Sequence, residues 1–185
     1  QQPHPTDCKV PHLQQIHTDL AFQDHLITFA ELDLAINRQK KHKAVGPDEI
    51  PAECYKELDD EGRQAVLKLL NDWWERKHIP PENLKARVIL IYKKGDKSRI
   101  TNYRPISLLQ VGYKMFASIM LTRLIESGAD SRMWPFQYGF RPGRSTTDAI
   151  LIARRVVEDA WACRDGSCML LALDWAKAFD SFMSH

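Results

Sequence analysis

The stretch ARVILIYKKGDKSRITNYRPISLL, residues 86–109, decides the fold class of this chain. Its first part, Ala86–Tyr92, is rich in β-branched residues and predicts a strand. Lys93–Asp96 contains a glycine and predicts a turn, and Tyr103–Leu109 predicts a second strand that returns beside the first. We therefore predict a β-hairpin whose tip carries positive charge.

Helical patterns surround this hairpin. Apolar residues recur at helical spacing in five places, and several of these runs begin with a capping residue or a proline. The predicted helices begin at Thr28, Pro51, Asp59 or Asp60, Val111 and Ser145. In the last of them we expect four residues to face inward: Ile150, Leu151, Val156 and Val157. An all-apolar strand is predicted over Cys168–Leu173, so the fold class is α+β with a helical first half.

The composition excludes several classes of protein. The chain has 185 residues, of which 44% are hydrophobic, and this is enough to form a core. It contains no apolar run of about 18 residues and no apolar stretch typical of a signal peptide near its start, so we expect no membrane span. Four cysteines without a CxxC pair fit free thiols in a reducing compartment, which indicates an intracellular protein. The cysteines do not distinguish a nuclear from a cytoplasmic location.

The net charge of +2 is uninformative, but the distribution of charge is not. Basic residues gather in one strip that contains a single acid, Asp96: Lys85, Arg87, Lys93, Lys94, Lys97, Arg99 and Arg104. A local basic strip on a nearly neutral protein is typical of a surface that binds a polyanion. The alternative is an ordinary solvated face.

A second candidate segment is the loop QYGFRPGRST, residues 137–146. Its glycines allow close backbone approach, its arginines supply charge and its aromatic residues offer stacking faces. The helix that follows favours an anion at its N-terminus. The loop could therefore contact nucleic-acid backbone and bases, or it could be an aromatic loop that packs on its neighbours.

The third candidate is Asp174, which directly follows the predicted strand Cys168–Leu173. A carboxylate at the end of a buried strand lies at the rim of the sheet, where it can bind a metal ion. The alternative is that Asp174 caps the turn formed by residues 176–180. The pattern alone favours neither.

Taken together, the segments NYRPISLL (102–109), QYGFRPGRSTTDAI (137–150) and LDWAKAFD (173–180) resemble the reverse transcriptases of non-LTR (LINE-type) retrotransposons, and less closely those of group II introns. AVGPDEIPAECYKEL (44–58) also looks like the region that precedes the fingers in that family. The likeness covers roughly residues 28–182.

The resemblance implies the fingers and the start of the palm of a right-hand polymerase that extends a DNA primer with dNTPs on an RNA template. Mg²⁺, with Mn²⁺ as the alternative, would be its metal cofactor once the remaining palm carboxylates are present. The family's roles fall on these residues: Asp174 as a catalytic metal ligand, Lys93, Lys94 and Arg104 at the incoming triphosphate, Phe179 against the sugar, and Gln137, Gly139, Phe140, Arg141 and Arg144 beside the template.

The resemblance also suggests a division of the chain. The expected parts are a polar lead-in (1–27), a helical region (28–82), the fingers with their connecting helices (83–167) and the first palm strand with the incomplete start of the palm (168–185). The family needs two further carboxylates, but no Asp-Asp pair follows Asp174. We therefore expect a truncated polymerase without activity on its own. The alternatives are a non-catalytic fingers remnant that binds nucleic acid and a decayed relic.

Overall fold

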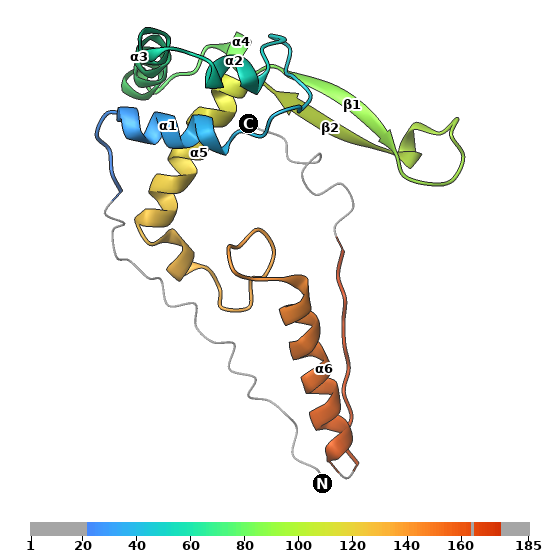
Figure 1. Ribbon diagram of the computed structural model, residues 1–185. Coiled ribbons are helices and arrows are strands. Elements are labelled where there is room, and N and C mark those ends of the chain that lie inside the picture. Colours follow the sequence, from blue (N-terminus) through green and yellow to red (C-terminus); the bar gives the residue numbers. More distant parts are fainter. Residues whose placement is uncertain (1–21, 164, 175–185) are drawn as a thin grey trace. The chain divides into compact units, whose positions relative to one another are not determined.

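A computed structural model of the chain describes residues 22–163 and 165–174 (Figure 1). The chain divides into two compact units, Gln1–Arg132 and Met133–His185. The elements of the first unit are α1 (Phe29–Arg38), α2 (Ala52–Lys56), α3 (Asp60–Arg76), α4 (Pro81–Leu84), β1 (Ala86–Tyr92), β2 (Tyr103–Leu109) and α5 (Val111–Glu126), with short 3-10 turns at Ile100–Asn102 and Ala129–Arg132. The second unit contains α6 (Thr146–Ala162).

The first unit combines helices with a small antiparallel sheet, as the sequence predicts. β1 and β2 have the predicted bounds, and they pair with each other along their full length. The caps of two helices are also confirmed. Thr28 and Glu31 form a capping box at the start of α1, and the side chain of Asp59 accepts a hydrogen bond from the Gly62 N–H at the start of α3.

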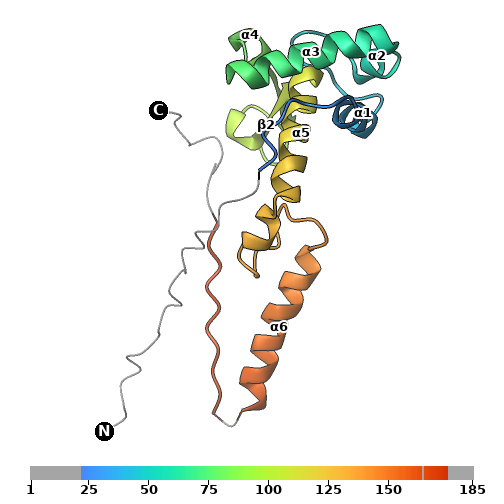
Figure 2. The same ribbon diagram turned by 90° about the vertical axis from the view of Figure 1, so that its left-hand side faces the viewer.

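The hydrophobic core of the first unit lies where α1, α3 and α5 meet. α1 lies beside α5, and α3 crosses near the first turns of α5 (Figures 1 and 2). The ring of Trp73 meets the ring of Phe116 edge to face, with 5.8 Å between the ring centroids. The fully buried apolar residues of this core are Leu32, Leu70 and Met115, with Ile36 and Trp73 almost as buried. Leu32 and Ile36, and likewise Leu70 and Trp73, lie three or four positions apart, so each pair shares one face of its helix.

A charged residue, Arg123, also lies in this buried region. It is the most voluminous of the fully buried side chains, and it follows Ile119 by one helical turn on α5. Its Nε donates to Glu31 Oε1 at 2.6 Å and its Nη2 donates to Glu31 Oε2 at 2.9 Å. The other donors reach backbone carbonyl oxygens of the segment before α1, at Gln23, His25 and Leu26. Every N–H group of the buried guanidinium therefore has an acceptor.

The same contact changes the acidity of Glu31. The hydrogen bonds from Arg123 are the main cause, with smaller contributions from the backbone and hydroxyl of Thr28, and they lower the pKa of Glu31 from 4.5 to about 2. Partial burial acts in the opposite direction. The carboxylate is therefore charged throughout the neutral and mildly acidic range, and it matches the permanent charge of Arg123.

The base of the hairpin is attached to the helices by close backbone packing. A Cβ at Gly46 would lie 2.7 Å from the backbone nitrogen of Gln110, which joins β2 to α5. Near this contact, Arg87 of β1 forms an ion pair with Glu49 at 2.9 Å. Only glycine permits this approach, so the loop that contains Gly46 holds the junction from which the hairpin extends.

In the second unit, α6 begins at the predicted position. Ser145 and Asp148 form its capping box. The expectation that its apolar residues face inward is wrong for three of the four, because Ile150, Leu151 and Val156 are 66%, 56% and 53% exposed. The physical reason is that α6 is the sole helix or strand in the described part of this unit, so no second element covers it.

The strand predicted over Cys168–Leu173 is also absent from the structure. These residues are exposed and form neither a helix nor a strand. A strand requires a hydrogen-bonded neighbour, and in the part of the chain that the structure describes β1 and β2 pair only with each other. The apolar composition of the segment therefore predicted a strand that these residues do not form.

None of the described helices is both long enough and apolar enough to cross a bilayer.

We predict that Glu31→Gln lowers the free energy of unfolding of the first unit by about 3 kcal/mol, because it leaves a buried guanidinium without its counter-charge. Since the pKa of Glu31 is lowered by folding, its contribution to stability is complete above pH 4.5 and is lost as the pH falls toward 2. Urea unfolding of both proteins between pH 7 and pH 2.5 measures the difference, which should shrink as the pH falls.

The matched control is Asp72→Asn, which removes an exposed ion pair with Arg76 at 2.6 Å. It should change stability by less than about 0.5 kcal/mol, because solvent screens exposed pairs. Equal effects of the two substitutions at neutral pH would contradict the importance of the buried pair.

Candidate functional site

The register of the hairpin brings two of the predicted phosphate-binding residues to one face. Ile91 of β1 lies opposite Arg104 of β2, and Tyr92 lies opposite Tyr103. The Lys93 N–H then donates to the Asn102 carbonyl oxygen at 2.9 Å, which continues the ladder by one step. Opposed residues share a face and successive residues alternate, so Lys93 and Arg104 lie on the same face of the hairpin.

The other face carries an aromatic pair. The rings of Tyr92 and Tyr103 meet at 62° with 5.6 Å between their centroids. The ammonium group of Lys97 lies 5.6 Å from the centroid of the Tyr92 ring, within the range of a cation–π contact. The two faces of the hairpin therefore differ, with Arg104 on one face and the tyrosines on the other.

Residues 93–102 form the connection between the strands, which we call the tip loop. Three side chains bind its backbone carbonyl groups. The Tyr92 hydroxyl donates to Gly95 O at 2.6 Å, the Tyr103 hydroxyl donates to Lys97 O at 2.9 Å, and the Asn102 amide donates to Asp96 O at 2.8 Å. The loop is thus held from its own base by uncharged donors.

Asp96, the single acid of the basic strip, also has a structural role. Its carboxylate accepts a hydrogen bond from the Ser98 backbone N–H at 2.9 Å, and bonds from the backbone and hydroxyl of Ser98 lower its pKa. It lies 4.0 Å from the guanidinium of Arg99. Lys93 and Lys94 are exposed in this loop and Arg104 is exposed in β2, and no described ion pair includes them.

The predicted template-side residues lie in the second unit, in the loop before α6. The Gln137 amide donates to Gly139 O at 3.0 Å. Arg144 lies over the Tyr138 ring at 5.8 Å, and Arg141 donates to the carbonyl oxygen of Trp134 at 3.1 Å. The two arginines therefore have contacts that orient them.

Phe140 has an unusual backbone conformation in the same loop. Its φ is +60°, which is rare for a bulky residue, and its side chain is 96% exposed. Gly143 also has positive φ, at +69°. Two left-handed residues turn the chain sharply in this loop, and strained backbone of this kind gathers at functional sites.

Asp174 is exposed in the second unit. Phe179 lies outside the described residues. Among residues 22–163 and 165–174, no three His, Cys, Asp or Glu side chains are close enough to hold a metal ion. The described residues therefore do not fit a complete magnesium site, because Asp174 would be the single carboxylate.

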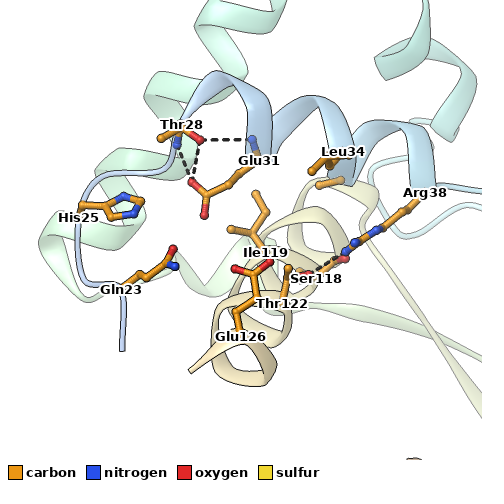
Figure 3. Close-up of a pocket in the computed structure, with 11 residues that line it drawn as sticks. Gln23, His25, Thr28, Glu31, Leu34, Arg38, Ser118, Ile119, Thr122 and Glu126 are labelled. Atoms are coloured by element: carbon orange, nitrogen blue, oxygen red, sulfur yellow. Dashed lines mark hydrogen bonds between the residues drawn. The ribbon is translucent and has the colours of Figure 1, made fainter. Parts of the chain in front are cut away.

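A cavity of about 240 Å³ between α1 and α5 contains none of the predicted site residues (Figure 3). Arg38 donates to the Thr122 hydroxyl at 2.7 Å on one side of it, and the capping box of Thr28 and Glu31 lies on the other. Two carboxylates line the cavity, Glu31 and Glu126, and Glu31 is already paired with Arg123. We assign the cavity to the packing of α1 on α5.

The residues that hold the tip loop are absent from the predicted site. Tyr92 and Tyr103 lie in the two predicted strands and Asn102 begins the motif NYRPISLL, but the sequence assigns none of them a role. A signal for them exists: once both strands are predicted, Tyr92 and Tyr103 are the residues that flank the loop, where an antiparallel register places them opposite each other.

Comparison with known proteins identifies the family of this chain. The family model described as reverse transcriptase (RNA-dependent DNA polymerase) matches residues 91–183, just over half of the chain. The chain is 32% identical to the transposon TX1 uncharacterized 149 kDa protein of Xenopus laevis over 155 residues, which are 83% of the chain and 12% of that protein. It is 29% identical over 161 residues to the RNA-directed DNA polymerase from mobile element jockey of Drosophila funebris, with 83% of the chain and 17% of the relative covered.

A third relative is the Pol polyprotein from the type-1 retrotransposable element R1 of Bradysia coprophila, which is 29% identical over 154 residues. Those residues are 82% of the chain and 15% of the relative. The chain thus spans less than a fifth of the length of these three relatives. The chain belongs to the reverse transcriptase family, and the predicted kinship with enzymes of non-LTR retrotransposons is confirmed.

We predict that Gly95→Ala loosens the tip loop. Gly95 has a φ of +96°, and an added Cβ would lie 2.9 Å from the Asn102 amide nitrogen. A side chain in this conformation costs about 1–2 kcal/mol, which corresponds to roughly 5- to 30-fold less protection against hydrogen exchange. The amides of Arg99 and Asn102, which are bonded inside the loop, should report this change.

Gly139→Ala is the matched control, since its added Cβ would be 3.8 Å from the nearest atom and its φ lies outside the left-handed range. It should leave the protection of the tip loop unchanged. Unaltered exchange in the Gly95→Ala variant would show that the loop does not depend on this conformation.

Proposed function

We propose that this chain supplies the fingers and the start of the palm of an RNA-directed DNA polymerase, which adds dNTPs to a DNA primer on an RNA template. The observation that carries the proposal is the hairpin, on which Lys93 and Arg104 share one face and the strand residues Tyr92 and Tyr103 hold the tip loop. Family membership supplies the reaction class.

The chemistry of these cations suits a triphosphate. The planar fork of Arg104 can bind two phosphate oxygens at once, while Lys93 and Lys94 act as point charges. A two-stranded element fixes the spacing of the charges better than an unpaired loop does, because both of its strands hold the backbone. We assign the incoming dNTP to this face of the hairpin.

We assign the template to the loop of the second unit. Gln137, Gly139, Phe140, Arg141 and Arg144 combine exposed aromatic surface with cations whose directions are set by neighbouring groups. Such a combination supports stacking on bases and contact with phosphates without reading sequence. Recognition of the template should therefore tolerate different base sequences.

We assign Asp174 as one ligand of the catalytic magnesium and Phe179 as the residue that excludes a ribose 2′-hydroxyl. The two-metal reaction of the family needs two further carboxylates in addition to Asp174 and the substrate phosphates. For the division of the chain we retain the helical region 28–82, the fingers 83–167 and the first palm segment 168–185.

We predict that the chain binds a short single-stranded RNA with a strong dependence on salt. The logarithm of the affinity should fall with the logarithm of salt concentration by about 0.7 for each phosphate neutralised. Lys93→Gln and Arg104→Gln should each reduce that slope by about 0.7, because each removes one cation. Fluorescence anisotropy of a labelled RNA over a salt series measures both quantities.

Lys68→Gln is the control, because Lys68 is an exposed lysine of α3 outside the hairpin. It removes the same charge and should leave the slope unchanged. Equal slopes for all four proteins would show that the hairpin cations do not meet the RNA.

We predict that the chain alone does not extend a primer, because its sequence has no Asp-Asp pair after Asp174. A primer-extension assay with RNA template, DNA primer, dNTPs and Mg²⁺ tests this. Incorporation that disappears in an Asp174→Ala variant would contradict the prediction. Salt-dependent RNA binding without incorporation is the result expected of a nucleic-acid-binding polymerase segment.

A further inference from the structure

The tip loop presents an arrangement that the assigned function does not explain. Besides Lys93, whose N–H donates to the Asn102 carbonyl oxygen next to the last strand pair, it carries three cations that no described backbone bond of this kind links to the opposite strand: Lys94, Lys97 and Arg99. An unsupported loop would let these side chains move over a wide volume. Ordering them at the moment of binding would then cost conformational entropy and weaken affinity.

The structure removes much of that freedom with uncharged groups. Tyr92 and Tyr103 are the two strand residues next to the loop, and their rings support each other at 5.6 Å. From this base their hydroxyl groups reach the carbonyl oxygens of Gly95 and Lys97, at 2.6 and 2.9 Å. Two residues inside the loop are thus tied to the rigid end of the hairpin.

A third bond and a ring contact complete this support. The Asn102 amide donates to Asp96 O at 2.8 Å, so consecutive carbonyl groups at positions 95, 96 and 97 are all occupied. The Lys97 ammonium also lies over the Tyr92 ring. Lys97 is therefore held twice, through its carbonyl by one tyrosine and through its ammonium by the other.

We propose that Tyr92, Tyr103 and Asn102 are positioning residues for phosphate binding, which hold the tip-loop cations in the arrangement that meets a nucleic-acid or nucleotide polyanion. They act through Lys94 and Lys97 and make no contact with the ligand. This inference rests on the assignment of the hairpin to phosphate binding in the proposed function.

The main test uses the double substitution Tyr92→Phe and Tyr103→Phe. It keeps both rings, the edge contact and the net charge, and it removes only the two hydroxyl groups. Each hydrogen bond contributes only modestly to the order of the loop, but the double substitution removes two of them. We therefore expect the chain to bind the labelled single-stranded RNA about tenfold more weakly. Asn102→Ala is a second variant and should weaken binding in the same direction.

A double-mutant cycle separates positioning from a general structural effect. In a Lys94→Gln and Lys97→Gln background, the two Tyr→Phe changes should weaken binding by less than about twofold, because the cations that they position are gone. Circular dichroism should show the same thermal midpoint for the core in all variants, while exchange of the Arg99 and Asn102 amides speeds up in the tyrosine variant.

The outcomes are distinguishable. An equal loss of affinity in both backgrounds, or no loss in either, overturns the positioning role and leaves the proposed function intact. A wild-type chain that does not bind the RNA overturns both. A tenfold loss confined to the background with Lys94 and Lys97 present supports the inference.

Discussion

The first unit depends on the buried guanidinium of Arg123. A buried charge is tolerated only when all of its donors are satisfied, and here Glu31 and three backbone carbonyl groups accept every N–H. The acceptors come from the start of α1 and from the segment before it, while the donor comes from α5. Arg123 therefore fixes how α1, α5 and the segment before α1 pack together. A different packing of these three would leave the buried charge of Arg123 unpaired.

The position of α5, which Arg123 fixes, also determines where the candidate site begins. β2 runs through Gln110 directly into α5, so the position of α5 sets where the hairpin begins. Close packing of Gly46 on that junction and the ion pair between Arg87 and Glu49 add two further attachments. Beyond them β1 is exposed along its length. The hairpin is thus fixed at its base and open to a ligand along its strands.

Neutral and charged residues have different roles in the tip loop. Hydroxyl and amide groups hold the backbone, while lysines and arginines remain exposed. Apart from Asp96, which lies 4.0 Å from Arg99, the groups that hold the loop are neutral, so most of its positive charge stays available to a polyanion. In the second unit a neutral group likewise supports a cation. Arg144 lies over the ring of Tyr138, close in sequence to Phe140 with its positive φ.

Local signals in the sequence by themselves determined the family, both strands of the hairpin and the helix caps at Thr28 and Ser145, and they limited a third cap to Asp59 or Asp60, because these features depend on neighbours in the chain. Burial was decided by tertiary structure. Arg123 is buried although arginine is rarely buried, because partners about a hundred residues away in sequence accept its donors. The apolar residues of α6 and Cys168–Leu173 are exposed for the converse reason: hydrophobic sequence indicates a face that could be covered, but only a packed neighbour covers it.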